Sequence, residues 1–274
     1  SLIAQWTATG YEITFDGNGS DGGSAPATGR YVTGGAPYSV ALNTFTKTGY
    51  DFTGWKTSGA VDYAPGAGYA SPANLVLIAQ WVPKTIVISY NVNGGSGSAP
   101  APANWTYNTG APASLETGTG LTKTGYTFGG WRDGSTTYTG GQTISGVSAN
   151  TTLTAIWTLL PPAALSAPVA MPGDHAGTVT VTPPSLTTGG QVTSYKIVAT
   201  DASGVPINPE KSCTVNAPAT SCVITGLTNG TTYKFIATAT NAAGSTTSSP
   251  SNAIVPASIP GAPTAVTATR GDET

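Results

Sequence analysis

The side chains that carry out catalysis in most enzymes are scarce in this sequence. Its 274 residues include one histidine, His175, and two cysteines, Cys213 and Cys222. A serine or cysteine nucleophile needs a base that a third group orients, and a zinc site needs several nitrogen or sulfur ligands. His175 lies in a predicted turn over residues 172–177, and we expect it to be solvated because catalysis would need an oriented partner. We therefore predict a protein that is not an enzyme, with no catalytic residue, metal site or cofactor.

The twelve acidic residues suggest two further kinds of site, and their placement argues against both. Paired carboxylates hydrolyse glycosides, but here the acids are scattered and no pair recurs. Residues 16–21 resemble the start of a calcium loop, which needs glycine at its sixth position and glutamate at its twelfth. Asp21 and Ala27 occupy those positions, and the equivalent residues 91–97 contain no carboxylate. We interpret both segments as β-turns.

Cys213 and Cys222 flank a short proline-containing link between two predicted strands. In an oxidising compartment such a pair favours a local disulfide. Closing this ten-residue loop would contribute about 2.7 kcal/mol on the chain-entropy model. The alternative is two unpaired thiols that act as small core hydrophobes.

Composition excludes several classes of partner. Only 8% of residues are charged and the net charge is -2, whereas about a quarter of an ordinary soluble domain is charged. Without a lysine or arginine cluster we expect no binding to nucleic acid or to an anionic membrane surface. The longest apolar runs, such as residues 75–78, are far too short to span a bilayer. Regularly placed Trp, Tyr, Ile and Val nevertheless supply the apolar surface of a folded chain.

Three motifs recur in the same order and indicate tandem structural units. Strand-like segments end at Trp6, Trp81 and Trp157, at nearly equal spacings. Residues 47–55, KTGYDFTGW, match residues 123–131, KTGYTFGGW, and the distance between these copies agrees with the tryptophan spacing. Residues 13–19 match residues 88–94, and Gly35-Ala36-Pro37 recurs at residues 110–112.

The elements that carry these motifs are predicted to be strands. Tyr11, Ile13 and Phe15 alternate with polar residues before an Asn-Gly turn signal, as a half-buried strand requires, and helical periodicity is absent. The fixed places of the repeated aromatic residues favour core packing, although exposed tryptophans could instead stack on sugars. The predicted core residues are Trp6, Trp55, Trp81, Trp131, Trp157, Tyr50 and Tyr126.

Trp105 is the exception to this pattern. The spacing between Trp6 and Trp81 aligns Trp105 with Arg30 of the first repeat. The first repeat therefore has no aromatic residue at the position of Trp105. An unshared aromatic residue is a better candidate for a contact surface than for the core. We predict that Trp105 contacts a ligand or partner.

The motifs F-D-x-N-G, G-Y-x-F-x-G-W and Q-W resemble the internalin B-repeat family, also called the Listeria-Bacteroides repeat. The resemblance covers roughly half of the chain, with Asn91 in place of the usual aspartate and Ile156 in place of the glutamine before the last tryptophan. It implies a small, ubiquitin-like β-grasp unit that is used in tandem as a spacer on bacterial surface proteins.

A different unit follows the Leu-Leu-Pro-Pro junction at residues 159–162. Predicted strands at residues 178–182, 195–199 and 233–239 fit a sandwich of seven or so short strands. Residues 227–233, with 241–244 and 250–251, resemble a fibronectin type III domain, in which Tyr233 would be the corner tyrosine. In strand B, Val181 stands where such domains usually bury a tryptophan.

Residues 259–268 resemble the first strand of a further fibronectin domain. They are followed by Arg270-Gly271-Asp272, a tripeptide that integrins recognise on flexible loops and that we interpret as a turn.

The sequence thus predicts an all-β or mainly β chain, with tandem small β-grasp-like repeats followed by an immunoglobulin-like (fibronectin type III) β-sandwich. The predicted parts are the last strand of a preceding repeat at residues 1–8, repeats at 9–83 and 84–158, the sandwich at 159–257 and the start of another at 258–274.

For function, we expect a non-enzymatic spacer or stalk of an extracellular, cell-surface or secreted bacterial protein or fibre. The alternatives are an adhesin segment that binds protein or glycan directly, and an accessory region of a large secreted polysaccharide-active enzyme. The expected partners are neighbouring domains of the same chain or further copies in a fibre, and a host or cell-surface protein or glycan in the adhesin case.

Overall fold

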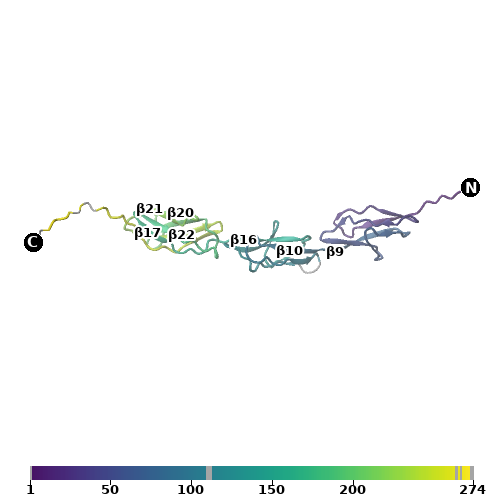
Figure 1. Cartoon of the computed structure of the whole chain (residues 1–274), viewed down its shortest axis with the longest axis horizontal. Helices are drawn as coiled ribbons and strands as arrows, with labels where there is room; N and C mark the ends of the chain where they lie inside the picture. The colour runs from purple at the N-terminus through teal and green to yellow at the C-terminus, as the bar shows by residue number, and fades with distance from the viewer. Residues whose placement is uncertain (1, 109–112, 263–264, 266, 272–274) are drawn as a thin grey trace. The chain divides into compact units, whose positions relative to one another are not determined.

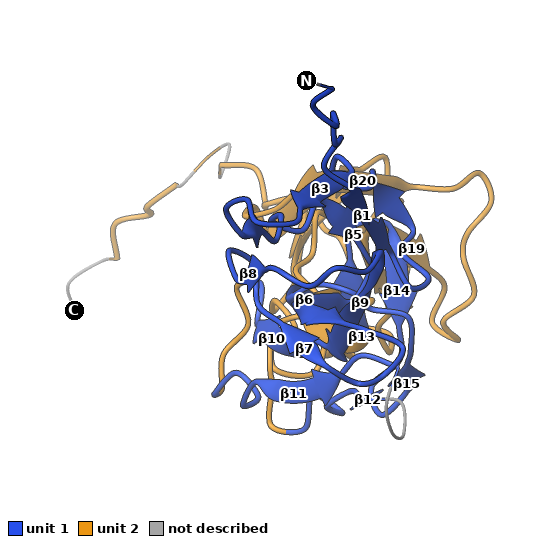
Figure 2. Ribbon diagram, turned by 90° about the vertical axis from the view of Figure 1, so that its right-hand side faces the viewer, with its two compact units in different colours: residues 1–93, 98–119, 130–155 blue, residues 94–97, 120–129, 156–274 orange. Residues whose placement is uncertain are grey.

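The computed structural model describes residues 2–108, 113–262, 265 and 267–271 (Figure 1). All regular elements in these residues are β-strands, so the predicted all-β class is confirmed. The chain divides into two compact units, drawn in blue and orange in Figure 2. Unit 1 comprises residues 1–93, 98–119 and 130–155, and unit 2 comprises residues 94–97, 120–129 and 156–274.

The first repeat forms a mixed five-stranded sheet in the order β3-β1-β9-β6-β7. Its central pair, β1 and β9, is parallel, and the outer neighbours are antiparallel. Two short ladders, β2·β5 and β4·β8, lie outside this sheet. The strands are β1 (Gly10–Asp16), β2 (Gly22–Gly23), β3 (Gly29–Val32), β4 (Tyr38–Ser39), β5 (Phe45–Thr46), β6 (Tyr50–Lys56), β7 (Asp62–Tyr63), β8 (Gly68–Tyr69) and β9 (Leu75–Pro83).

The second repeat has the same sheet order, β11-β10-β16-β13-β14, with the parallel pair β10 and β16 at equivalent places. A short ladder, β12·β15, accompanies it. Gly and Pro are frequent in the connections of both repeats, and these two residues are the poorest helix formers. The strands are β10 (Thr85–Asn91), β11 (Ala103–Thr106), β12 (Ala113–Ser114), β13 (Tyr126–Asp133), β14 (Thr136–Tyr138), β15 (Thr143–Ile144) and β16 (Thr151–Leu159).

Each repeat buries equivalent residues in its core. Trp55 and Trp131 are fully buried, and the Nε1 of each donates a hydrogen bond to a backbone carbonyl, of Ala41 and Glu116 respectively. A glycine with positive φ stands directly before each of these tryptophans, and in the first repeat it lies at a β-bulge between β6 and β9. The aliphatic residues around the two rings are Ile13, Leu77 and Ala79 in the first repeat and Ile88, Leu153 and Ala155 in the second.

The third domain is a sandwich of seven strands, as predicted. One sheet has the order β17-β18-β21 and the other β20-β19-β22-β23. Val181 is buried in the core between them, where the usual tryptophan is missing. The strands are β17 (Val169–Gly173), β18 (Ala176–Thr180), β19 (Ser194–Thr200), β20 (Ser212–Asn216), β21 (Ser221–Thr225), β22 (Lys234–Asn241) and β23 (Gly244–Thr247).

Tyr233 occupies the corner of this sandwich. Its side chain is buried, and its hydroxyl accepts a hydrogen bond of 3.2 Å from the backbone N–H of Thr228, a short way upstream in the chain. This is the contact that defines a tyrosine corner.

The prediction of a strand at residues 2–6 with a buried Trp6 is wrong. These residues form no strand, and Trp6 is 92% exposed. The equivalent strand β9 lies between β1 and β6, which both precede it in the chain. Among the described residues, no strand lies beside residues 2–6 to pair with them as β1 and β6 pair with β9.

At the other end, the first strand of a further domain remains a prediction. Residues 258–262 form no regular structure, and residues 263, 264 and 266 lie outside the described part of the chain.

Candidate functional site

His175 lies in the turn between β17 and β18, as predicted. Its Nδ1 is 3.1 Å from the carbonyl oxygen of Leu227, and its backbone N–H donates to the Asn229 side chain. The ring is largely exposed beside Asp174. Across the described residues, no three His, Cys, Asp or Glu side chains are grouped so that they could hold a metal ion.

The suspected calcium loop is a side-chain-capped turn. Asp16 accepts a hydrogen bond from the backbone N–H of Asn18, and Asn91 accepts the same bond from Asn93. Asn18 and Asn93 have positive φ, and their amide groups donate across the sheet to the carbonyls of Ala79 and Ala155. The D-x-N-G motif is thus explained by backbone hydrogen bonding, and asparagine can replace the aspartate because only an acceptor is needed.

The prediction that Trp105 forms a contact surface is wrong. Trp105 is 8% exposed and pairs with Ile86 across β10 and β11, where the first repeat pairs Tyr31 with Tyr11. Its structural counterpart is therefore the buried Tyr31 and not Arg30. Among the described residues, the Trp105 Nε1 has no hydrogen-bond partner.

Trp81 and Trp157, at the ends of the repeats, are half-buried. The Trp81 Nε1 donates to the carbonyl of Gly17, and each ring packs edge-on against the phenylalanine of the G-Y-x-F motif, Phe52 or Phe128. Neither ring offers a fully exposed face for a sugar.

The tyrosine of each K-T-G-Y motif was predicted to lie in the core, but Tyr50 is half-buried and Tyr126 is 36% exposed. Each motif forms a β-turn that is closed by a hydrogen bond from the tyrosine N–H to the lysine carbonyl. Glycine stands third in the turn with φ of +76° and +79°, as a type II turn requires. The turn comes directly before β6 or β13, and its tyrosine faces the residues that follow the repeat instead of the repeat's interior.

In the first repeat this turn contacts the second repeat, and we call the contact the first joint. A single residue, Lys84, separates β9 from β10. Its N–H donates to the carbonyl of Gly49 (2.9 Å), and its carbonyl accepts from the N–H of Tyr107 (2.9 Å). The Tyr107 ring packs edge-on against Tyr50, with ring centroids 5.5 Å apart, and a Cβ on Gly49 would overlap it.

Two charged groups support the first joint. The ammonium of Lys84 lies 3.5 Å from the Asp51 carboxylate. Asp21 accepts hydrogen bonds from the backbone N–H of Thr48 in the turn, and hydrogen bonding to the side chain and then the backbone of Thr48 lowers the pKa of the Asp21 carboxyl.

The second K-T-G-Y turn makes the equivalent contact inside unit 2, and we call it the second joint. Leu160 holds the position that Lys84 holds in the first joint, and its N–H donates to the carbonyl of Gly125 (3.0 Å). The carbonyl of Leu160 accepts from the Asn241 side chain of the sandwich (2.8 Å). A Cβ on Gly125 would come within 3.3 Å of Gly190. The same backbone hydrogen bond therefore joins the first repeat to a second repeat and the second repeat to the sandwich.

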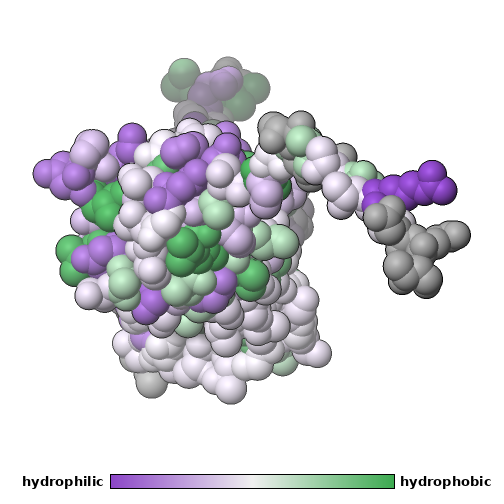
Figure 3. Space-filling view, turned by 90° about the vertical axis from the view of Figure 1, so that its left-hand side faces the viewer, coloured by the Kyte–Doolittle hydropathy of each residue, from purple (hydrophilic) through white to green (hydrophobic). Residues whose placement is uncertain are grey.

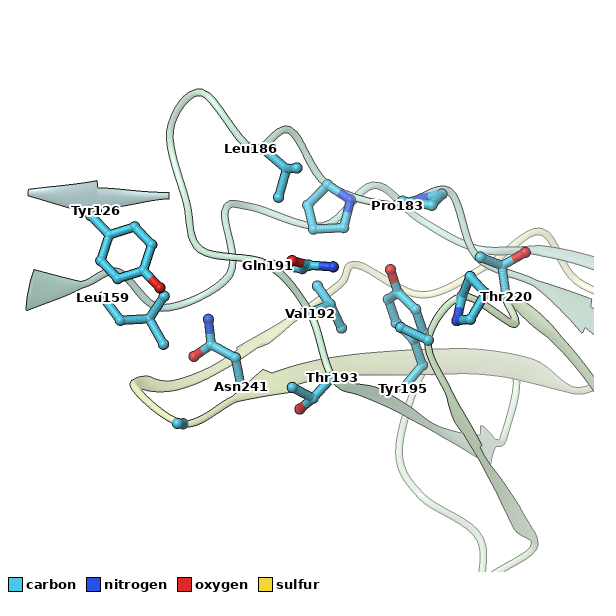
Figure 4. A pocket seen from close by; sticks show the side chains of 14 residues that line it. Tyr126, Leu159, Pro183, Leu186, Gln191, Val192, Thr193, Tyr195, Thr220 and Asn241 are labelled. Carbon is cyan, nitrogen blue, oxygen red and sulfur yellow. The ribbon is translucent and has the colours of Figure 1, made fainter. Parts of the chain in front are cut away.

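An open pocket of about 970 Å³ also lies in unit 2 (Figure 4). Tyr126 and Leu159 lie at one end, and Pro183, Tyr195 and Thr220 lie at the other. Tyr195 is 2% exposed, and burial raises the pKa of its hydroxyl. Periodicity could not reveal this pocket, because its lining comes from loops and strand ends.

The structure links Cys213 and Cys222 by a disulfide. Cys213 lies on β20, at the edge of one sheet, and Cys222 lies on β21, at the edge of the other. The bond therefore connects the two layers of the sandwich.

Charged residues are few on the described surface, and one tripeptide of the chain is known as a recognition motif. On the face drawn in Figure 3, strongly hydrophilic residues occur in small groups among residues of intermediate hydropathy, in agreement with the low charge content. In the Arg270-Gly271-Asp272 tripeptide, which we interpreted as a turn, Arg270 and Gly271 are exposed, and Asp272 lies outside the described residues, so the turn remains a prediction.

A family model described as Listeria-Bacteroides repeat domain matches residues 11–80 and 87–156, which together are about half of the chain. A second model, described as Fibronectin type III domain, matches residues 161–254. This is the order of modules that the motifs predicted. Domains of these two types are typically non-catalytic.

Two similar proteins come from Evansella cellulosilytica. One, named "Putative Gly-rich membrane protein", is 34% identical over 162 residues, which are 57% of this chain and 18% of that protein. The other, named "Putative membrane protein", is 33% identical over 93 residues, which are 32% of this chain and 14% of that protein. This chain thus spans less than a fifth of the length of the curated relatives it matches. Its described residues contain no helix that is long and apolar enough to cross a membrane.

Solved structures with some similarity include the fibronectin type III domain of the human collagen alpha-1(XX) chain, which is 28% identical with a TM-score of 0.29. That match covers 38% of this chain and 91% of the collagen domain. A crystal structure of domains from titin is 11% identical with a TM-score of 0.34, and covers 91% of this chain and 99% of the titin chain.

Proposed function

Because this chain belongs to the Listeria-Bacteroides repeat domain family, we propose that it is a non-enzymatic structural spacer of an extracellular bacterial surface protein. One observation carries this proposal. The N–H of the residue after each repeat, Lys84 or Leu160, donates to the glycine carbonyl of that repeat's K-T-G-Y turn. A chain built to hold successive domains in fixed order needs such a contact at each domain boundary.

The length of the connections supports the same role. A flexible linker of many residues would let neighbouring domains move independently. Here β9 is followed by one residue before β10, and β16 is followed directly by Leu160 and two prolines. Proline restricts the backbone, so it stiffens the second connection as well.

The surface location rests on the relatives and on the repeats. The similar Evansella proteins are named as membrane proteins and are much longer than this chain. We propose that parts of the full protein outside this segment provide attachment and any adhesive head, which the domains described above would project.

The first joint can be tested with a matched pair of glycine variants in the full chain. Gly49→Ala would place a Cβ on the Tyr107 ring, whereas Gly34→Ala, at a nearly equal φ of +79°, meets nothing within 4 Å. Both variants carry the strain of a positive φ, about 1–2 kcal/mol. We expect only Gly49→Ala to accelerate hydrogen exchange at the amides of Lys84 and Tyr107, by about tenfold or more.

Site-resolved exchange measured by NMR provides the readout, with the amides of Ile13 and Leu77 reporting on the interior of the first repeat. Equal exchange at Lys84 and Tyr107 in the two variants would show that the joint is not closed in solution and would count against the proposal.

A further inference from the structure

Residues 2–6 have the sequence of a buried strand but lie in the open. Their three large apolar side chains are all exposed, namely those of Leu2, Ile3 and Trp6. The five residues, Leu-Ile-Ala-Gln-Trp, are identical to residues 77–81 of β9. In that strand Leu77 and Ala79 are fully buried, because β9 lies between β1 and β6 in the sheet. Residues 2–6 therefore match a central strand, and the described residues contain no sheet around them.

Thr9 follows this segment at the position of a joint residue. It stands three residues after Trp6, which is the spacing between Trp81 and Lys84 in the first joint. The second joint has the same spacing after its tryptophan. Thr9 also directly precedes β1, as Lys84 directly precedes β10. Sequence and strand position thus place Thr9 where a joint forms after each of the other two tryptophans.

The backbone around Thr9 already has the arrangement of the first joint. The carbonyl of Thr9 accepts a hydrogen bond from the N–H of Thr33 (3.5 Å). The first joint has the same bond, from the N–H of Tyr107 to the residue before β10. The residue after the donor has a positive φ in both loops, and these residues are Gly34 and Asn108. One side of a joint is therefore present at Thr9.

The N–H of Thr9 is the group that this arrangement leaves open. In both joints the N–H at this position donates to the glycine carbonyl of a K-T-G-Y turn. Thr9 is exposed, and its N–H donates to no acceptor among the described residues. Both K-T-G-Y turns of this chain are already bound in joints, and both repeats contain their own last strand. A second copy of this chain therefore offers neither a free turn nor a place for residues 2–6.

We propose that residues 2–9 bind a further repeat of this family, which precedes them in the same protein. Residues 2–6 complete the sheet of that repeat as its last strand, and the Thr9 N–H donates to the glycine carbonyl of its K-T-G-Y turn. This inference rests on the proposed spacer function, and it names the partner to which the first repeat is joined.

The test extends the chain by a copy of its own first repeat, with isotope labels in the original residues only. Residues 9–76 are fused directly before Leu2, which restores the sequence of residues 75–81 across the junction. We expect the indole N–H of Trp6 to be hydrogen-bonded as its counterpart in β9 is, and the Thr9 amide to be closed in a joint. In site-resolved NMR, both groups should exchange about tenfold or more slowly than in the unextended chain.

Two aspartate variants of the extended chain form a matched pair. Leu2→Asp places a charge at the position of the fully buried Leu77, so it should remove the protection of Trp6 and Thr9. Thr7→Asp places the same charge at the position of an exposed residue of β9 and should leave the protection in place. In the unextended chain both variants should leave the fold unchanged, because both residues are exposed there.

Three results would overturn the proposal. The first is a Trp6 indole N–H that exchanges equally fast with and without the added copy. The second is protection of Trp6 without protection of Thr9, which would mean that no joint forms. The third is an equal response to the two aspartate variants. The amides of Lys84 and Tyr107 report on the first joint in the same sample, so a failure of the spacer function would be seen separately.

Discussion

Trp55→Ala should lower the unfolding free energy of the first repeat by about 3–5 kcal/mol. The ring is fully buried, contacts Phe15, Phe45 and Phe52, and donates a hydrogen bond to the Ala41 carbonyl. Its removal leaves a cavity and an unpaired carbonyl. A domain this small has only a few kcal/mol of stability, so we expect the repeat to be largely unfolded at room temperature.

The measurement is urea denaturation of the full chain, followed through the amide NMR signals of Ile13 and Leu77, because a multidomain chain does not unfold in one transition. Trp6→Ala is the control, since it deletes the same ring from a residue that is 92% exposed and should leave the transition in place. Equal effects of the two substitutions would contradict the observed placement of Trp6 and Trp55.

Replacing both Cys213 and Cys222 by serine should lower the unfolding free energy of the sandwich by about 2.7 kcal/mol, the loop-closure contribution. Because the disulfide connects the edges of the two sheets, its loss also frees β20 and β21 to separate. In a domain of about 100 residues the midpoint of thermal unfolding should fall by roughly 10–20 °C.

Calorimetry of oxidised and reduced protein provides the check. Dithiothreitol should bring the wild-type chain to the stability of the double variant and leave the variant unchanged. Two titratable thiols in the folded, unreduced wild-type chain would contradict the disulfide.

Much of the fold could be predicted because its signals are local. Alternation around Ile13, the Asn-Gly turns and the two copies of K-T-G-Y each predict a structure from a few neighbouring residues. The sandwich strands and the place of Tyr233 followed in the same way. A repeated motif also predicts that its copies share an environment, which holds for Trp55 and Trp131.

Trp105 shows where spacing fails. In the first repeat Tyr11 pairs with Tyr31, and in the second Ile86 pairs with Trp105. The connection between the paired strands is one residue shorter in the second repeat, so a single offset cannot align both strands. A shift of one residue moves a side chain to the opposite face of a strand, and a uniform offset therefore assigned Trp105 to the exposed position of Arg30.

The joints and the pocket could not be predicted for a different reason. Periodicity identifies residues that recur, but it does not distinguish a contact within a repeat from a contact with the domain that follows. Tyr50 meets Tyr107 of the second repeat, whereas Tyr126, at the same motif position, lines a pocket with residues of the sandwich. Only the folded chain brings these residues together.

The central claim is that the hydrogen bonds of the first joint make the two repeats move as one body, and ¹⁵N relaxation of the wild-type chain tests it most directly. The amides of the first repeat, such as Ile13 and Trp55, and those of the second, such as Ile88 and Trp131, should report one common rotational correlation time. Two distinct and shorter correlation times, one for each repeat, would contradict the account.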